Sequence, residues 1–485
     1  MKTEYFRSKV QTEKSAVLFY EEVMFLNKYI GDKAFYRTVL GISIPIMVQN
    51  GITNFVSLLD NLMVGRIGTE EMSGVSIVNQ FVFVFNILIF GAVSAAGIFT
   101  AQYHGYGDKD GVRNTFRFKM LTNIIVAFLA VVTFLCFDEQ LISLFLHNGS
   151  VEGDLSETLS FGVEYLRVIL IGMIPYAITQ VYASNMREMG ETVLPMIASI
   201  IAVATNFVLN LLLIFGLFGF PQLGVTGAAI ATVVSRFVEM IVLVVWGHTH
   251  INECTFLSGA YRSFRIPRAL FRRIVLTGLP LMFNELFWAL SVTMRNQCYS
   301  TRGLDVVAAQ NINSTIVNLF NVVYLALGSS IGIVVGNLLG AGKLEEARDT
   351  DRKMIFFSVS CAAGMGVLLG SIALPYARLY ETNETIRLLS VFMIVVSAVT
   401  MPLCAYAHAS YFTLRTGGRV LITFFLDSFY MWVFVIPVTA VLAYFTGIGI
   451  HWLFIAGQTA EALKCILAYV ILKKGSWANQ LVLDK

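Results

Sequence analysis

Residues 105–117 read GYGDKDGVRNTFR, and residues 340–352 read GAGKLEEARDTDR. Two glycines, an arginine, a threonine and a second arginine stand at the same places in both stretches, and each stretch follows a long apolar segment. At the same spacing along the chain, Pro45 corresponds to Pro280. A repeat of this kind predicts that the chain is built from two related halves.

The composition is that of a membrane protein. Of the 485 residues, 56% are hydrophobic and 13% are charged, whereas a soluble domain has about a quarter charged residues. The mean hydropathy is +0.72. With so little polar surface, the chain is expected to expose its apolar side chains to lipid. The six cysteines are scattered without CxxC spacing, which indicates packing residues rather than a metal site or a disulfide framework.

Apolar windows long enough to cross about 30 Å of hydrocarbon predict twelve transmembrane helices. In the first half, the windows cover residues 37–64, 72–104, 118–137, 159–187, 193–217 and 224–247. In the second half, they cover residues 272–300, 305–339, 354–379, 386–414, 420–446 and 449–472. We therefore predict an all-α membrane protein with six helices in each of two pseudo-symmetric lobes.

These windows divide the chain into five parts. The parts are an N-terminal segment (1–33), a six-helix lobe (34–247), a basic linker (248–271), a second six-helix lobe (272–472) and a tail (473–485). The N-terminal segment has mixed charge and lacks the apolar run of a cleavable signal peptide. Two alternatives are open for residues 17–30, an amphipathic helix on the membrane surface or a frayed tail.

Basic residues are concentrated in alternate loops. They are Lys109, Arg113, Arg117 and Lys119, then Arg262, Arg265, Arg268, Arg272 and Arg273, then Lys343, Arg348, Arg352 and Lys353, and finally Lys473 and Lys474. The segment 138–158, on the opposite side, contains acids but no Lys or Arg. By the positive-inside rule, both termini are cytoplasmic and the protein is a multi-pass inner-membrane protein. Because six is an even number, both halves have one orientation and are related by an axis along the membrane normal.

A stripe of polar residues runs along the first span, on one helical face. It includes Asn50, Thr53, Asn54 and Asp60. A charge at the bilayer centre costs about 3 kcal/mol or more, so this face must line water or form hydrogen bonds with other helices. Asn79 in the second span and Asn318 in the eighth belong to the same pattern. So many amides on apolar helices favour a hydrated cavity over buried structural networks.

Four polar groups of the first half are expected at one depth. At about 1.5 Å per residue, Asp60, Asn206, Asn210 and Thr232 all lie roughly 7 to 16 Å below the outer surface. A carboxylate, two amides and a hydroxyl would supply the all-oxygen shell that Na⁺ prefers, with Asp60, Asn206 and Thr232 as its ligands. Two alternatives remain: Asp60 carries a proton, or the amides only bridge helices.

The second half has acids of its own. Glu285 lies close to Phe283, Phe287 and Trp288, and an acid among aromatic rings suits an organic cation. Asp427 either faces the same cavity or caps a helix end. The residues predicted to line a substrate cavity are Asn50, Asn54, Asn79, Glu285, Trp288, Asn318 and Asp427.

Other patterns are interpreted as structural. Gly332, Gly336 and Gly340 form a GxxxGxxxG run, which lets helices approach closely. The members of three pairs spaced three residues apart are expected to neutralise each other: Glu164 with Arg167, Arg236 with Glu239, and Glu461 with Lys464. No GxxxxGK[ST] loop is present, so we expect no ATPase activity, and no cluster of acids or histidines indicates an enzyme.

Four strings carry a resemblance to a known family. They are LDNLMVGRIG at 59–68, GVTGAAIAT at 224–232, GLP at 278–280 and LRTGG at 414–418. In this order and spacing, from about residue 34 to residue 472, the sequence resembles the bacterial type of the multidrug and toxic compound extrusion (MATE) family. The resemblance implies two six-helix lobes in a V around a central cavity. It further implies export of organic cations in exchange for Na⁺ or H⁺, with no cofactor besides the coupling ion.

The resemblance also assigns residues. Asp60 matches the key acid of the family's first lobe, and Asn206 and Thr232 match its cation-site amide and hydroxyl. Asn210 stands where some members have Asp, which favours Na⁺ over a site of two carboxylates that binds a proton. Glu285 stands three residues before the acid of some members, and the tenth span lacks their second acid, so the second lobe departs from the pattern.

Rival functions come from two classes. A flippase for lipid-linked oligosaccharides has a related architecture but needs a broadly basic cavity, and here the intramembrane acids outnumber unpaired arginines, although Arg295 is an exception. An ion channel would conduct far faster than any carrier. For partners we expect small organic cations and membrane lipids, no nucleic acid, and a monomer.

Overall fold

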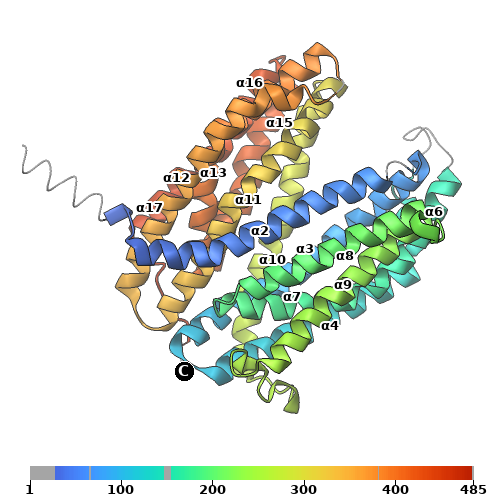
Figure 1. The fold of residues 1–485 in the computed structure, drawn as a ribbon. Helices are drawn as coiled ribbons and strands as arrows, with labels where there is room; N and C mark the ends of the chain where they lie inside the picture. The colour runs from blue at the N-terminus through green and yellow to red at the C-terminus, as the bar shows by residue number, and fades with distance from the viewer. Residues whose placement is uncertain (1–27, 65–66, 147–154, 381, 483–485) are drawn as a thin grey trace, which may run out of the picture.

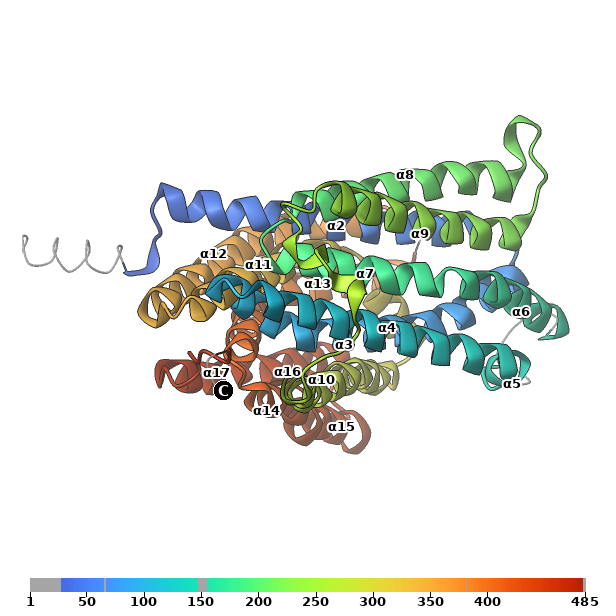
Figure 2. The same cartoon turned by 90° about the horizontal axis from the view of Figure 1, so that it is seen from below.

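The structure is a computed structural model that describes residues 28–64, 67–146, 155–380 and 382–482. The side chains of residues 56–62 and 69 lie outside this description, as does nearly all of the predicted amphipathic segment 17–30. The described residues form helices and connecting turns without strands. Figures 1 and 2 show two helical bundles, the first coloured blue to green and the second yellow to red.

The first bundle contains the helices of the predicted first lobe. They are α2 (Lys33–Val64), α3 (Thr69–Tyr106), α4 (Lys109–Cys136), the short α5 (Asp138–Ser143), α6 (Leu155–Ile171), α7 (Met173–Glu188), α8 (Val193–Phe215) and α9 (Gly224–Thr249). The helices α6 and α7 form one bent unit with an angle of 45° between them. Its break lies at Gly172, against the side chains of Val233 and Arg236.

The second bundle repeats this plan. Its helices are α10 (Arg268–Ser300), α11 (Leu304–Gly340), α12 (Leu344–Ala377), α13 (Glu384–Thr416), α14 (Val420–Phe424), α15 (Ile436–Phe445), α16 (Ile450–Ala462) and α17 (Lys464–Lys473). Two π-helical turns, Phe425–Phe429 and Met431–Val435, join α14 to α15 into one span. Asp427 lies in the first of these turns, and π turns are frequent at functional sites.

The prediction of twelve transmembrane helices is confirmed. Among the described residues, ten helices are long and apolar enough to cross a membrane, and the bent pair α6–α7 is an eleventh. The 32-residue α2, at the place of the first predicted span, is also long enough to cross about 30 Å of hydrocarbon. Most helices begin within four residues of their apolar windows, but two begin nine or ten residues earlier, α4 at Lys109 and α12 at Leu344. Their first turns are charged, so hydropathy does not detect them, but Asp108 caps α4 by accepting hydrogen bonds from the amides of Asp110 and Gly111.

The two bundles meet where α3 and α11 pack against each other and diverge toward the ends where α6 and α16 lie (Figure 1). Glycines permit this contact, because a Cβ on Gly340 would lie 2.0 Å from the carbonyl oxygen of Gln102. A Cβ on Gly105 would likewise lie 1.9 Å from the carbonyl oxygen of Asn337. The close approach predicted for the GxxxGxxxG run is therefore confirmed at its last glycine.

The helix α2 belongs to both bundles. It packs against α11 of the second bundle and against α8 of the first, and Figure 1 shows it passing from one to the other. Near the beginning of α2, the buried hydroxyl of Ser43 bonds that of Ser330 in α11 at 2.8 Å. Toward the middle, the amide of Gln49 donates to Ser199 in α8 at 2.8 Å. The helix α2 is thus bonded to both bundles, so a movement of one bundle can be transmitted through it to the other.

The C-terminal segment, predicted only as a tail, is fastened across the same junction. Trp477 is buried, with 3% of its surface exposed. The amide of Leu481 donates to the side chain of Gln102 in α3 at 2.6 Å. The side chain of Gln480 donates to the carbonyl of Gly340 in α11 at 2.6 Å. The tail therefore links one helix of each bundle.

We expect Gly340→Ala to destabilise the protein, because the added methyl group must push α3 and α11 apart. Overpacking of this kind costs about 1–3 kcal/mol, so the melting temperature of purified protein should fall by several degrees. Gly364→Ala is the matched control, since a Cβ on Gly364 meets nothing within 4 Å. Equal melting temperatures for the two variants would show that the contact is not tight.

Candidate functional site

A cluster of amide and hydroxyl groups lies inside the first bundle. Asn206 and Asn210 are four residues apart on α8, so their side chains share one helical face. The amide of Asn210 donates to the side-chain oxygen of Asn206 at 3.1 Å. The amide of Asn206 in turn approaches the hydroxyl of Thr232 in α9 at 3.4 Å. Both asparagines are buried. Three of the four groups predicted to lie at one depth are thus brought together.

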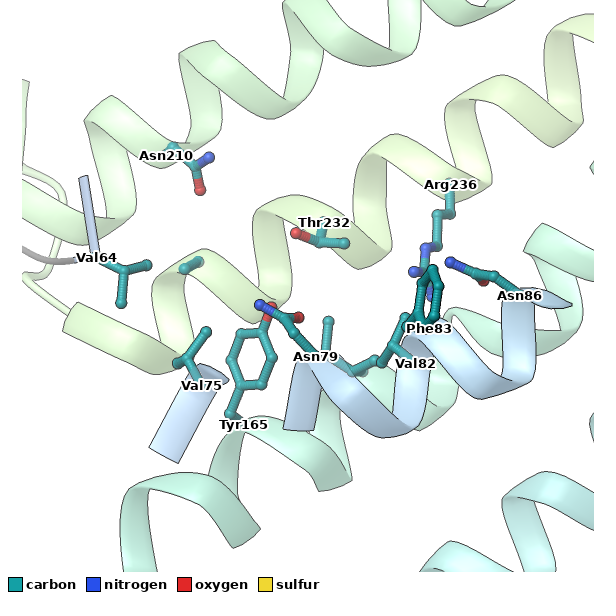
Figure 3. Close-up of a pocket in the computed structure, with 12 residues that line it drawn as sticks. Val64, Val75, Asn79, Val82, Phe83, Asn86, Tyr165, Asn210, Thr232 and Arg236 are labelled. Carbon is teal, nitrogen blue, oxygen red and sulfur yellow. The ribbon is translucent and has the colours of Figure 1, made fainter. Parts of the chain in front are cut away.

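This cluster opens on a pocket of about 370 Å³, shown in Figure 3. Asn210 and Thr232 line it from α8 and α9, and Val64 lines it from the end of α2. Asn79 of α3, predicted to line the substrate cavity, faces this pocket instead of the space between the bundles. Asp60 lies one turn before Val64 in α2, but its side chain is outside the described residues. Its contact with the cluster therefore stays a prediction.

The same pocket contains a positive charge. Arg236 of α9 lines its other end, and its guanidinium lies 5.1 Å from the ring centre of Tyr176. The predicted ion pairs of Arg236 with Glu239 and of Glu164 with Arg167 do not form in the described structure, because Glu239 accepts a hydrogen bond from Ser199 at 2.5 Å and Arg167 pairs with Asp138 at 2.8 Å. No carboxylate is found among the described residues that line this pocket. Cation binding here would thus require a negative charge from Asp60.

A second cavity, of about 410 Å³, lies between the two bundles. Asn50 faces it from α2, as predicted. The cavity shares no lining residue with the first pocket among those described. Its aromatic and charged lining comes from both bundles: Phe90, Tyr176, Arg187, Glu188, Glu239, Phe412 and Arg415. Such a mixture of rings and charges can hold an amphipathic organic molecule.

The first-bundle side of this cavity is a network of compensated charges. The fully buried Lys119 pairs with Glu188 and donates to Ser184 at 3.0 Å. Arg187 donates to the side-chain oxygen of Gln49 at 3.3 Å. Gln49 is connected through Ser199 to Glu239. Positive and negative groups therefore alternate here without an isolated charge.

Sequence reasoning missed Arg187, Glu188 and Arg415. Arg187 is the last residue of the window 159–187, and Arg415 comes directly after the window 386–414. Charged residues at these places are readily interpreted as lying in the membrane–water interface. The signal in the sequence was a glycine three residues after each of the two arginines. In the structure these glycines, Gly190 and Gly418, both have positive φ.

The acids of the second bundle lie apart from this cavity. Asp427 pairs with Lys464 at 3.2 Å and accepts a hydrogen bond from Asn284 at 3.2 Å. Lys464 also contacts Glu461 at 3.4 Å, which confirms that predicted pair, and Glu461 pairs with Arg295. Two cations and two anions thus form one neutral chain inside the bundle.

The remaining predicted residues are dispersed. Glu285 accepts a hydrogen bond from the hydroxyl of Tyr411 at 2.7 Å. Trp288, Asn54 and Asn318 lie on exposed helix faces. Among the described residues that line the cavity between the bundles, Asn50 is the one member of the predicted substrate set. Roles in substrate binding for the other six stay predictions.

Comparison with known proteins agrees with the two-bundle architecture. The profile of the family described as MatE matches residues 45–212 and 280–441, one stretch in each bundle. The probable multidrug resistance protein NorM of Thermotoga maritima is 23% identical over 93% of this chain and 94% of its own length. The probable multidrug resistance protein YoeA of Bacillus subtilis is 21% identical over 90% of this chain and 92% of its own.

The fold is also that of a solved structure. An outward-facing multidrug resistance MATE family transporter of the MOP superfamily superposes with a TM-score of 0.81. The match has 20% identity and covers 93% of this chain and 98% of the other.

We expect Glu461→Gln to destabilise the second bundle strongly. The substitution leaves Arg295 and Lys464 buried with Asp427 as their one anion in the chain, and breaking such a buried network costs about 3–5 kcal/mol. Thermal unfolding of purified protein measures the effect. Glu345→Gln is the control, because Glu345 forms an ion pair with Arg348 but its side chain is 87% exposed. Similar melting temperatures for both variants would contradict a structural role for the chain.

Proposed function

Because the chain belongs to the MatE family of multi-pass membrane transporters, we propose that it is a secondary active multidrug exporter. In this proposal it expels small organic cations in exchange for Na⁺ or H⁺ by alternating access. The observation that carries the proposal is the presence of two separate cavities, one inside the first bundle and one between the bundles. Separate cavities allow the coupling cation and the substrate to bind at different places and to affect each other through the conformation of the protein.

The orientation follows from charge. The turns 107–109 and 341–343, which lead into the Lys- and Arg-containing beginnings of α4 and α12, lie at the end where the bundles meet. By the positive-inside rule this end faces the cytoplasm, with both termini, and the bundles diverge toward the outside. The arrangement then corresponds to an outward-facing state in the inner membrane.

Coupling is assigned to Asp60 and the cluster beside it. A cation held by Asp60, Asn206, Asn210 and Thr232 would neutralise the carboxylate of Asp60. Because the positive charge of Arg236 in the same pocket repels cations, that carboxylate must be ionised before a cation enters. The change would pass along α2, which contacts both bundles and contains Pro45, to the substrate cavity at Asn50. A ligand shifts such an equilibrium only through its different affinity for the two states.

The available energy is sufficient without ATP. One inward cation moving through a membrane potential of 100 mV yields about 2.3 kcal/mol, which supports about a fortyfold gradient of a substrate without net charge. Exchange of Na⁺ or H⁺ down a chemical gradient adds to this amount. Exchange for a monovalent organic cation is electroneutral, so the concentration gradient of Na⁺ or H⁺, or a second coupling ion, then supplies the energy. The absence of a nucleotide-binding loop from the sequence agrees with this energy source.

We expect Asp60→Asn to abolish cation-driven export, because a neutral amide cannot alternate between a charged and a compensated state. Uptake of a fluorescent cationic dye into everted membrane vesicles, driven by an imposed Na⁺ or pH gradient, measures this export directly. Replacing Na⁺ at fixed pH identifies the coupling ion. Asp305→Asn, at the exposed beginning of α11, is the control and should transport normally. Undiminished export by the Asp60→Asn protein would end the proposal for this residue.

A further inference from the structure

Arg415 is a buried cation without a hydrogen-bonded or ion-paired partner among the residues that the structure describes. It is the next-to-last residue of α13, and 7% of its surface is exposed. Its guanidinium makes no hydrogen bond or ion pair with any residue that the structure describes, and its Nη1 is buried without a partner. A guanidinium carries five N–H donors, and leaving them unsatisfied away from water is costly. Arg415 also lines the cavity between the bundles.

Aromatic rings hold this guanidinium in place without neutralising it. It lies 5.2 Å from the ring centre of Phe412, 5.8 Å from that of Phe90 and 6.0 Å from that of Tyr411. Phe90 comes from α3 of the first bundle and the other two from α13 of the second. Ring faces attract a cation but accept none of the directed hydrogen bonds that a carboxylate would take up.

The other bundle has an equivalent arginine whose surroundings differ. Arg187 is the next-to-last residue of α7, lines the same cavity and precedes Gly190 as Arg415 precedes Gly418. Arg187, however, donates to Gln49 and is followed in the chain by Glu188. In the second bundle, Thr416 stands at the place of that acid. The repeat has therefore kept the cation and lost the anion beside it.

No acid forms an ion pair with Arg415 among the described residues. Glu285 accepts a hydrogen bond from the hydroxyl of Tyr411 and attracts Arg415 only from beyond ion-pair distance. Asp427 and Glu461 are used by Lys464 and Arg295. Glu188 and Glu239 belong to the network of the first bundle. The N–H donors of Arg415 are thus left for a ligand.

We propose that Arg415 is an anion-binding subsite for the substrate. Its guanidinium would bind a carboxylate of the transported molecule, bidentately where geometry allows, while the rings around it contact the apolar body. A monocation without a carboxylate would leave the N–H donors of Arg415 unsatisfied. The preferred substrates are therefore zwitterionic amphiphiles, which carry a carboxylate in addition to a cationic group. This inference rests on the proposed export function and specifies its substrate class.

A matched pair of dyes tests the inference. A rhodamine with a free carboxylate is a zwitterion, whereas its methyl ester is a monocation with the same ring system. In everted vesicles, we expect the wild-type protein to transport the free acid at least as well as the ester. Fluorescence anisotropy with purified protein should show tighter binding of the free acid, and this comparison needs no variant.

Variants then locate the effect. Arg415→Gln should lower transport and binding of the free acid about tenfold or more and leave the ester unchanged or improved, while Arg415→Lys should keep part of the preference. Arg419→Gln is the control, because Arg419 is exposed at the same helix end, does not line the cavity and donates to the carbonyl of Ser476. Melting temperatures confirm that each variant is folded.

The outcomes separate the inference from the proposed function. Transport of the ester but not of the free acid by the wild type would overturn the inference and leave the export function standing. Equal loss of both dyes in Arg415→Gln, or loss of neither, would also overturn it, because the residue would then be structural or irrelevant. Failure to export either dye would remove the proposed function, and the inference with it.

Discussion

A charged side chain inside a membrane-embedded bundle must find its counter-charge within the protein, because lipid offers neither hydrogen bonds nor counterions. Much of the interior follows this constraint. Lys119 with Glu188 in the first bundle, and the chain from Arg295 through Glu461 and Lys464 to Asp427 in the second, are neutral groups built by helices far apart in sequence. The places where the compensation is incomplete among the described residues are informative, since they coincide with cavities.

The internal repeat makes this contrast visible. A shared helix plan gives each bundle an arginine at the end of its α7 or α13 and a glycine turn after it. What fills the interior differs: amides and a hydroxyl gather between α8 and α9, whereas the second bundle is closed by ion pairs. Two copies of one scaffold have thus become specialised, the first with a polar pocket and the second with a rigid charged core.

The sequence predicted the features that depend on the length of an apolar segment and on the depth of a residue in the membrane. Spans were found because each is long and apolar, and Asn206 and Thr232 were placed together because they lie at equal depths on adjacent helices. Rotation of a helix about its axis was not predictable, so Asn79 was assigned to the wrong cavity and Asn54 and Asn318 were expected beside Asn50. Pairing by spacing succeeded for Glu461 and Lys464 but failed for Arg236 and Glu239, since Ser199 and Tyr176 come from other helices.

The junction of the bundles has properties that alternation requires. Besides apolar contacts such as those of Ile98 with Leu281 and Val420, it is built from backbone approaches at Gly105 and Gly340 and from a few hydrogen bonds, including those of Gln102 to the C-terminal tail. Contacts of this type are strong only at one geometry, because a small displacement separates the backbones and removes the bonds together. The junction can therefore be either closed or open, and α2, which is bonded to both bundles through Ser43 and Gln49, is placed to transmit binding at one cavity to the other.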